Sequence, residues 1–236
     1  VSDSSAAPAP EAQGFSLPEL PVSVQIGKID SPRIVLGEAL LGEAVTASVS
    51  GALMLEGGEG RATLQLERLD DAPKTEFDLM ASFANSSRRL VVDLVAKEEA
   101  GGLIGKKIRL PGQPDFELSL KGDGIVDAFA LRLKLATGGQ DRLAGQVTLM
   151  RQQDSRGFNF SADVGGNVAP LFLPDYAEFF GTETRLIATG ALAEDGAMDL
   201  NNLAVTTNAL TVSGHLSLAA DGLPLRFGLD AALVDA

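Results

Sequence analysis

The chain contains no cysteine and no tryptophan, and only one histidine and one tyrosine among its 236 residues. The absence of cysteine excludes thiolate metal sites and disulfide frameworks, although it does not exclude an oxidising compartment. The one imidazole, His215, stands between aliphatic residues on the polar side of a predicted strand. A catalytic triad or zinc site of the usual form needs further histidine or cysteine partners. We therefore predict no enzyme activity, no catalytic residue, no metal site and no cofactor.

Positive charge and long apolar runs are also scarce. The formal net charge is −13, so the chain has no electrostatic footprint for nucleic acid and is repelled by anionic lipid headgroups. No stretch approaches the roughly 18 apolar residues of a membrane helix. Residues 1–16 are rich in Pro, Ala and Ser and are predicted to be a linker. We expect any membrane anchor or export signal to lie outside this chain.

Short alternating runs fill the remainder, residues 17–236. In "AFALRLKLA" the apolar Phe129, Leu131 and Leu133 alternate with the polar Arg132 and Lys134, a spacing typical of a strand with one apolar face. Each run ends at glycine, asparagine or charged residues, as the turns of an antiparallel meander require. The last of these pairs two strands across an Asp221-Gly222 turn.

Two stretches interrupt the alternation. A short helix or lid is predicted near residues 100–110, and a second short helix is predicted at 174–181, where Pro174 can occupy the first position. The second stretch holds Tyr176, Phe179 and Phe180, which we interpret as the face of a helix docked on the sheet, the alternative being a lining for an apolar cavity.

Acidic pairs and glycines add two smaller expectations. The pairs Asp70-Asp71 and Glu98-Glu99 stand at strand ends, where turn and solubility roles are predicted. A loose motif of a small residue, glycine and alternating aliphatic residues recurs without a fixed period. Its glycines, in phase with the apolar residues, predict a sheet bend or a close backbone approach; they are Gly51, Gly145, Gly190 and Gly214.

The central question is what the apolar faces contact. Leu, Val, Ala and Gly dominate the inward positions, and large aromatic residues that would fill a compact core are few. We therefore predict an all-β fold in which a long curved antiparallel sheet forms an open, taco-like groove with an apolar interior, plus one or two short helices. The residues predicted to line the groove are Val49, Leu53, Leu55, Leu64, Leu66, Phe77, Leu79, Phe83, Leu90, Val92, Leu94, Leu118, Leu120, Phe129, Leu131, Leu133, Leu135, Val147, Leu149, Phe158, Phe160, Leu216, Leu218, Leu225 and Phe227.

Several stretches resemble the TamB proteins of α-proteobacteria, within the AsmA-like group of bridge proteins. They include "LPELPVSVQIGKIDSPRIVLGEALLGEAVTASVSGALML" (residues 17–55), "LSLKGDGIVDAFALRLKLATGGQDRLAGQVTL" (118–149) and "LFLPDYAEFFG" (171–181). The resemblance extends over most of the chain. It consists of a similar pattern of strands and turns and includes no catalytic motif. It implies a periplasmic β-groove, anchored in the inner membrane elsewhere in the full-length protein, which reaches the outer-membrane barrel TamA through a domain that this chain lacks.

The resemblance also implies a role. The chain is expected to be a non-enzymatic segment that conducts phospholipid from the inner to the outer membrane and supports outer-membrane protein assembly. Phospholipid acyl chains would be its partners, with no nucleic acid. Two alternatives remain open: a scaffold or chaperone that binds strands of outer-membrane proteins by β-augmentation, and a polysaccharide-binding or adhesin β-sandwich.

Overall fold

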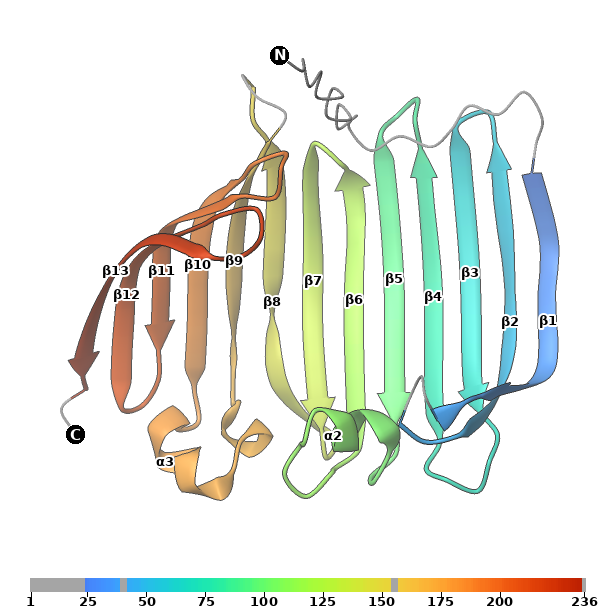
Figure 1. Cartoon of the computed structure of the whole chain (residues 1–236), viewed down its shortest axis with the longest axis horizontal. Coiled ribbons are helices and arrows are strands. Elements are labelled where there is room, and N and C mark those ends of the chain that lie inside the picture. The colour runs from blue at the N-terminus through green and yellow to red at the C-terminus, as the bar shows by residue number, and fades with distance from the viewer. Residues whose placement is uncertain (1–23, 39–41, 154–156, 235–236) are drawn as a thin grey trace, which may run out of the picture.

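The computed structural model describes residues 24–38, 42–153 and 157–234, which form one antiparallel sheet of thirteen strands (Figure 1). The predicted linker, residues 1–16, lies outside the described residues. Strand order in the sheet equals strand order in the chain. The strands are β1 (Val24–Leu36), β2 (Val45–Glu56), β3 (Glu59–Arg68), β4 (Thr75–Ala84), β5 (Arg89–Glu98), β6 (Phe116–Ile125), β7 (Ala128–Thr137), β8 (Gln140–Arg151), β9 (Phe158–Gly166), β10 (Thr184–Leu192), β11 (Met198–Thr206), β12 (Leu210–Leu218) and β13 (Pro224–Leu233).

This arrangement confirms the prediction of an all-β, open antiparallel sheet with short helices: the described strands form a single sheet and not the two packed sheets of a sandwich. Helix α2 (Leu103–Lys107) lies in the β5–β6 connection. The β9–β10 connection holds η1 (Ala169–Leu171), η2 (Pro174–Tyr176) and α3 (Ala177–Phe180). Both lie in the stretches where the alternation of the sequence breaks.

Tight turns keep consecutive strands adjacent. Gly57 and Gly58 join β2 to β3, and Gly138 and Gly139 join β7 to β8, all four with positive φ. Two-residue connections with positive φ at both positions match the right-handed twist of the strands that they join. Glycine reaches this conformation without steric cost, so these two turns set the register of their hairpins.

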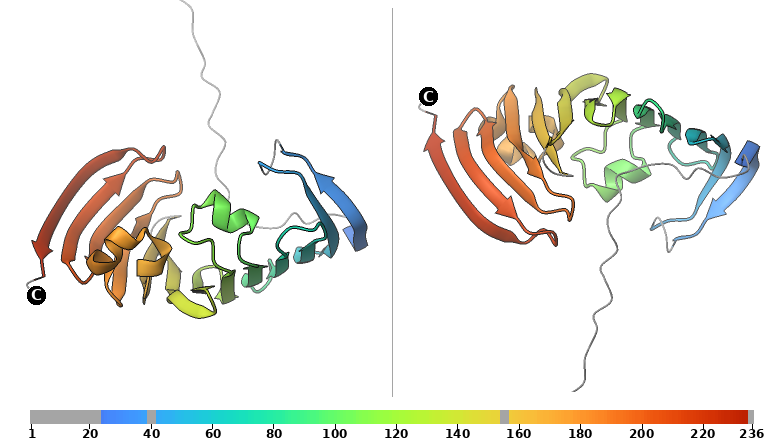
Figure 2. Two further views of the ribbon diagram at one scale, coloured as in Figure 1. Left: turned by 90° about the horizontal axis from the view of Figure 1, so that it is seen from below. Right: turned by 90° about the horizontal axis from the view of Figure 1, so that it is seen from above.

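The sheet is curved into a trough. Viewed along the strands it has the outline of a U, with β1 and β2 in one wall and β11 to β13 in the other (Figure 2). Helix α2 lies on the concave side (Figure 2). Among the described residues, β1 and β13 each pair with only one neighbouring strand, so the sheet does not close into a barrel.

Most of the buried residues lie at the end of the trough that carries α2. Ala47 is fully buried there, and Leu110 from the β5–β6 connection and Thr137 at the end of β7 are almost fully buried. The opposite end has fewer buried side chains, among them Phe83 and Phe129. A small packed core therefore covers one end of the concave face and leaves the remainder uncovered.

The aromatic cluster of α3 does not pack on the sheet, so its interpretation as a docked helical face is wrong. Tyr176 is 54% exposed and Phe179 is 38% exposed. The ring of Phe180 stacks on Phe172, with 4.2 Å between the centroids. Backbone hydrogen bonds attach the helix to the sheet. The backbone N–H of Asn208, in the β11–β12 turn, donates to the backbone carbonyl of Phe180 at 3.2 Å.

Candidate functional site

The strand register divides the side chains into an apolar face and a polar face. Directly opposed residues of an antiparallel pair project to the same side of the sheet. Leu64 is opposite Leu79, Leu79 is opposite Leu94, and Leu94 is opposite Leu120. Following these pairs from β2 to β13 places the residues that were predicted to line a groove on one face, except Leu225, which lies at a register shift and is opposite no residue of β12.

Two uninterrupted rows of apolar residues cross the whole sheet, with one residue from each strand. The central row consists of Ile29, Gly51, Leu64, Leu79, Leu94, Leu120, Leu133, Gly145, Val164, Leu186, Val205, Val212 and Ala231. The second row consists of Ile26, Leu53, Ala62, Ala81, Val92, Gly122, Leu131, Val147, Ala162, Ala188, Leu203, Gly214 and Leu229. At about 4.8 Å between strands, each row is roughly 55–60 Å long.

The apolar face is the concave face. Glu98 belongs to it, since Glu98 is opposite Thr75 and Phe116 on the neighbouring strands. The Glu98 carboxylate accepts hydrogen bonds from the Ile104 and Gly105 amides of α2, each at 2.9 Å. Because α2 lies inside the U of the sheet (Figure 2), the side chains on the same face as Glu98 line the trough.

No second layer of structure covers this face outside the end that carries α2. In the described chain, the extensive contacts between elements are those between adjacent strands and those among the three short helices η1, η2 and α3. Leu64, Leu94 and Leu120 are therefore only partly buried, although they occupy the middle of the sheet. The apolar face measures roughly 1,500 Å², which exceeds the few hundred Å² of a typical exposed patch several-fold.

Sequence reasoning missed part of each row. The omitted positions include Ile26 and Ile29 in β1 and Leu186, Leu203 and Val205 in the last third of the chain. Register shifts lie in β1 between Ile26 and Ile29, and in β11 between Leu200 and Leu203. A bulge inserts one residue and reverses the alternation, so a strict two-residue period cannot follow the face through it.

The glycines of the recurring motif lie on the apolar face, where a neighbouring backbone approaches closely. A Cβ atom at Gly145 would lie 2.2 Å from the Asp163 carbonyl oxygen, and one at Gly190 would lie 2.0 Å from the Asp199 carbonyl oxygen. Neither space admits a side chain. These glycines accommodate the close approach that the sequence pattern predicted.

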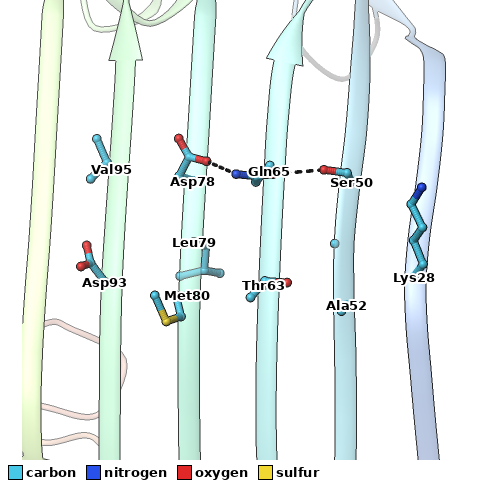
Figure 3. Close-up of a pocket in the computed structure, with 11 residues that line it drawn as sticks. Lys28, Ser50, Ala52, Thr63, Gln65, Asp78, Leu79, Met80, Asp93 and Val95 are labelled. Atoms are coloured by element: carbon cyan, nitrogen blue, oxygen red, sulfur yellow. Dashed lines mark hydrogen bonds between the residues drawn. The ribbon is translucent and has the colours of Figure 1, made fainter.

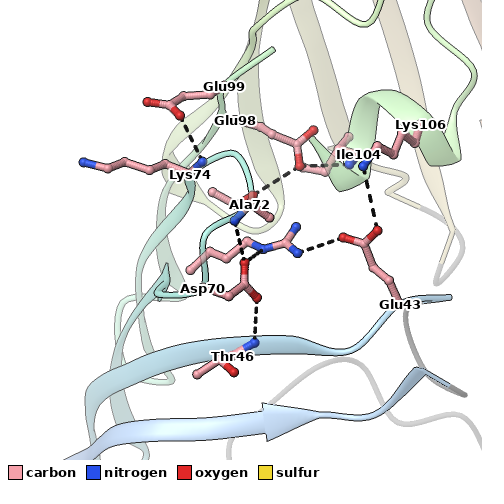
Figure 4. A network of polar contacts seen from close by, with 11 residues as sticks. Glu43, Thr46, Asp70, Ala72, Lys74, Glu98, Glu99, Ile104 and Lys106 are labelled. Carbon is pink, nitrogen blue, oxygen red and sulfur yellow. Dashed lines mark hydrogen bonds and ion pairs between the residues drawn. The ribbon is translucent and has the colours of Figure 1, made fainter. Parts of the chain in front are cut away.

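Buried charges hold together the covered end of the trough (Figure 4). The Arg68 guanidinium donates to Glu43 at 2.8 Å and to Asp70 at 2.7 Å. The hydrogen bond from Arg68 lowers the pKa of Asp70, and the Thr46 amide, which donates to the same carboxylate, lowers it further. Lys106 of α2 also contacts Glu43, at 3.8 Å.

Glu98 corrects the solubility role that was predicted from its position at a strand end. Its side chain is buried and forms the polar attachment of α2 to the apolar face. Its neighbour Glu99 is exposed and accepts a hydrogen bond from the Lys74 amide at 3.1 Å. Two adjacent glutamates thus have different roles because they project to opposite sides of the sheet.

The convex face is polar and carries cross-strand ion pairs. Arg89 binds Asp123 at 2.7 Å, and Arg185 binds Asp163 at 2.6 Å. In each pair the hydrogen bond from the arginine lowers the pKa of the aspartate. Exposed ion pairs of this kind contribute little to stability. Their charged side chains make the convex face the hydrated face of the sheet, in contrast to the apolar concave face.

A shallow depression of about 550 Å³ lies on the convex face over β1 to β5 (Figure 3). Ser50, Gln65 and Asp78 form a hydrogen-bonded chain across it, with bonds of 3.3 Å and 3.0 Å. Lys28 and Asp93 also line it. The depression is wide open, and its polar groups already bond to one another, so it offers no enclosed ligand site.

His215 lies exposed on the polar face, above the backbone of Gly228. In the described residues no three or more His, Cys, Asp or Glu side chains are grouped so as to hold a metal ion. Nor does any helix there have the length and apolar character needed to cross a membrane.

Comparison with known proteins found no matching family model, no matching curated protein and no matching solved structure.

Proposed function

We propose that this chain is a segment of a periplasmic bridge protein of the TamB and AsmA-like kind, in which the concave face conducts phospholipid between the inner and outer membranes. The observation that carries the proposal is the pair of apolar rows that cross all thirteen strands without a polar residue. A face of this size and polarity in an acidic, water-exposed chain needs an apolar occupant.

The energetics suit transport better than tight binding. Each buried methylene contributes about 0.8 kcal/mol, so an acyl chain of about sixteen carbons lying half-covered on a row gains roughly 6 kcal/mol. This interaction is not directional, and successive strands present chemically similar side chains. A hydrocarbon tail that moves from one strand to the next therefore exchanges equivalent contacts, while its headgroup remains in water at the mouth of the trough.

The wider role follows the resemblance of the sequence. In the full-length protein, an inner-membrane anchor and the barrel partner TamA would lie at the two ends of the bridge, both outside this segment. Support for outer-membrane protein assembly would follow from the lipid that the bridge supplies. The net charge of −13 disfavours adsorption of the segment to anionic headgroups, which suits a carrier that spans an aqueous compartment.

Site-specific photo-crosslinking in cells tests the proposal. Leu120 lies in the central row, and the adjacent Ser119 projects from the opposite face of the same strand. With a photoreactive amino acid at position 120 we expect covalent phospholipid adducts, detected by mass spectrometry, and at position 119 we expect none. Equal labelling at both positions, or protein adducts alone at position 120, would contradict a lipid-conducting face.

Stability measurements separate an open face from a packed core. Leu133→Asp should lower the free energy of unfolding by roughly 1–2 kcal/mol, because this side chain is partly exposed on the trough. Ala47→Asp, at a fully buried position on the same face, should cost roughly 4 kcal/mol or more. Urea denaturation provides both values, and equal large losses would mean that the protein itself fills the trough.

Among the described strands, β1 and β13 each pair with a single neighbour, which supports a second candidate, a scaffold that binds unfolded outer-membrane strands by β-augmentation. In that case the crosslinking experiment would give protein adducts at β13 and no lipid adducts at Leu120.

A further inference from the structure

A basic loop lies on the concave side of an otherwise acidic sheet. Residues 101–113, which we call the basic loop, contain Lys106, Lys107 and Arg109 and no acidic residue, whereas the whole chain has a formal net charge of −13. The basic loop includes α2, which lies inside the U of the sheet (Figure 2). The apolar side of the trough therefore carries a local positive charge that the overall composition of the chain does not suggest.

The base of the basic loop is fixed, and only its tip is exposed. The Gly101 amide donates to the Gln113 carbonyl at 2.8 Å, which closes the segment as an Ω-loop. Leu110 is buried, and its amide donates to the carbonyl of Gly105, which is also buried, at 2.9 Å. The four residues between these two buried positions, residues 106–109, are all exposed and form the tip of the basic loop. A fixed base thus presents a short tip to the trough.

The tip combines cations with one apolar side chain. Ile108 is 56% exposed and stands between Lys107 and Arg109. Within the described residues, the Arg109 guanidinium forms neither an ion pair nor a hydrogen bond, and the backbone of Arg109 has a φ of 56°. A residue other than glycine in this left-handed region is uncommon, and such residues cluster at functional sites. Lys106 differs from Arg109, because it contacts Glu43 at 3.8 Å (Figure 4).

The tip lies next to the apolar face. It begins directly after Gly105, whose amide binds Glu98 of β5 at 2.9 Å. The next residue of β5 on the concave face is Ala96, which is opposite Phe77 and Leu118. Two residues along a strand span about 7 Å. An anionic group bound at the tip can therefore remain attached to hydrocarbon that lies on the apolar face.

We propose that the tip of the basic loop binds the phosphate of a phospholipid headgroup while the acyl chains lie on the concave face. Lysine and arginine bind phosphate through charge-assisted hydrogen bonds, and Ile108 contacts the apolar part of the lipid beside the headgroup. This inference rests on the proposed lipid conduction and adds to it the chemical group that is recognised. The net charge of −13 opposes adsorption to a membrane surface, so the site acts on a lipid that is already in the trough.

Two lipids that differ only in the headgroup test the proposal. Phosphatidylglycerol and diacylglycerol, each with the same fluorescent acyl chain, are titrated with the protein at about 0.15 M salt, which screens distant charges. A basic side chain beside an anionic headgroup contributes about fivefold in affinity. The wild-type chain should therefore bind phosphatidylglycerol about tenfold or more tightly than diacylglycerol.

Charge reversal at the tip should remove this preference. Lys107→Glu/Arg109→Glu should bind the two lipids equally, with its affinity for diacylglycerol unchanged within about twofold. Both positions are exposed, so the variant should fold, which circular dichroism establishes. Arg132→Glu/Lys134→Glu is the matched control, because it makes the same charge change at exposed positions on the convex face of β7. This control should keep the preference for phosphatidylglycerol.

Each contrary outcome overturns a separate claim. Equal affinity of the wild-type chain for the two lipids, or loss of the preference in the β7 control, would overturn the headgroup site and leave lipid conduction intact. Inorganic phosphate that binds as tightly as phosphatidylglycerol, measured by isothermal titration calorimetry, would show that the loop binds a free anion and not a lipid. Binding of neither lipid would overturn lipid conduction, and the headgroup site with it.

Photo-crosslinking in cells locates the headgroup independently. A photoreactive amino acid at Ile108 should give phospholipid adducts, as one at Leu120 should. The control position is Met80, which is 55% exposed and projects from the convex face, and it should give none. Lipid adducts at Leu120 without any at Ile108 would overturn the placement of the headgroup alone.

Discussion

Replacement of Glu98 by alanine should release α2 from the concave face. The buried carboxylate accepts hydrogen bonds from the Ile104 and Gly105 amides at 2.9 Å and from the Thr75 hydroxyl at 3.2 Å. Gly102 is the N-cap residue of α2, and it has no side chain that could accept hydrogen bonds from the first amides of the helix. The Glu98 carboxylate takes the place of this missing cap. A Cβ atom at Gly102 would lie 2.1 Å from the Glu98 carboxyl carbon, so the cap comes from the sheet and not from the helix.

The size of the effect follows from these contacts. Glu98→Ala leaves two helix amides without an acceptor in a buried site, and each such loss costs about 1–3 kcal/mol. We expect a total loss of roughly 2–6 kcal/mol for the packing of α2. A five-residue helix is not stable alone in water, so the β5–β6 connection should detach as a unit. Glu98→Gln keeps one acceptor oxygen and should lose less.

Native-state hydrogen exchange measures this directly at the Ile104 and Gly105 amides, and urea denaturation provides the global free energy. Glu99→Ala is the matched control, because Glu99 is exposed and accepts one hydrogen bond, from the Lys74 amide. The control should change stability by about 0.5 kcal/mol or less. The assignment of Glu98 as the attachment of α2 is refuted if the two alanine variants have equal stability and equal exchange protection.

Two further predictions concern acid stability and backbone approach. The hydrogen bond from Arg68 lowers the pKa of Asp70 in the folded state. The Asp70 carboxylate therefore contributes its full stabilisation above the pKa of an aspartate in the unfolded chain, which is about 3.9. This stabilisation is lost as the pH falls through the lower pKa of the folded state. Asp70→Asn should cost roughly 2–4 kcal/mol at pH 7. It should also make the urea midpoint fall less steeply as the pH is lowered below the unfolded-state pKa; an unchanged slope would refute this linkage. Gly145→Ala should cost roughly 2–4 kcal/mol in thermal or urea unfolding, because its Cβ atom would meet the Asp163 carbonyl oxygen at 2.2 Å. Gly27→Ala meets no atom within 4 Å and should cost less than about 1 kcal/mol; similar losses in both variants would contradict the close approach.

Several features of the site lay beyond sequence reasoning. A bulge such as the one between Ile26 and Ile29 leaves no clear mark in a two-residue pattern, so the rows could not be traced through β1 and β11. Tyr176 and Phe179 resembled the buried face of a helix, but they are exposed, because the amphipathic pattern of a four-residue helix does not specify a partner.

In the strands without a bulge, alternation was enough to determine which side chains share a face, and the Gly57-Gly58 turn was enough to place β2 and β3 side by side. Leu118 and Leu120 must project away from Glu117 and Lys121 in any sheet, because the period of a strand is two residues. What covers that face was decided by the tertiary structure alone. Twist and bulges accumulated over thirteen strands bend the sheet into an open trough, and the burial of Glu98 under α2 depends on segments that meet only after this bending.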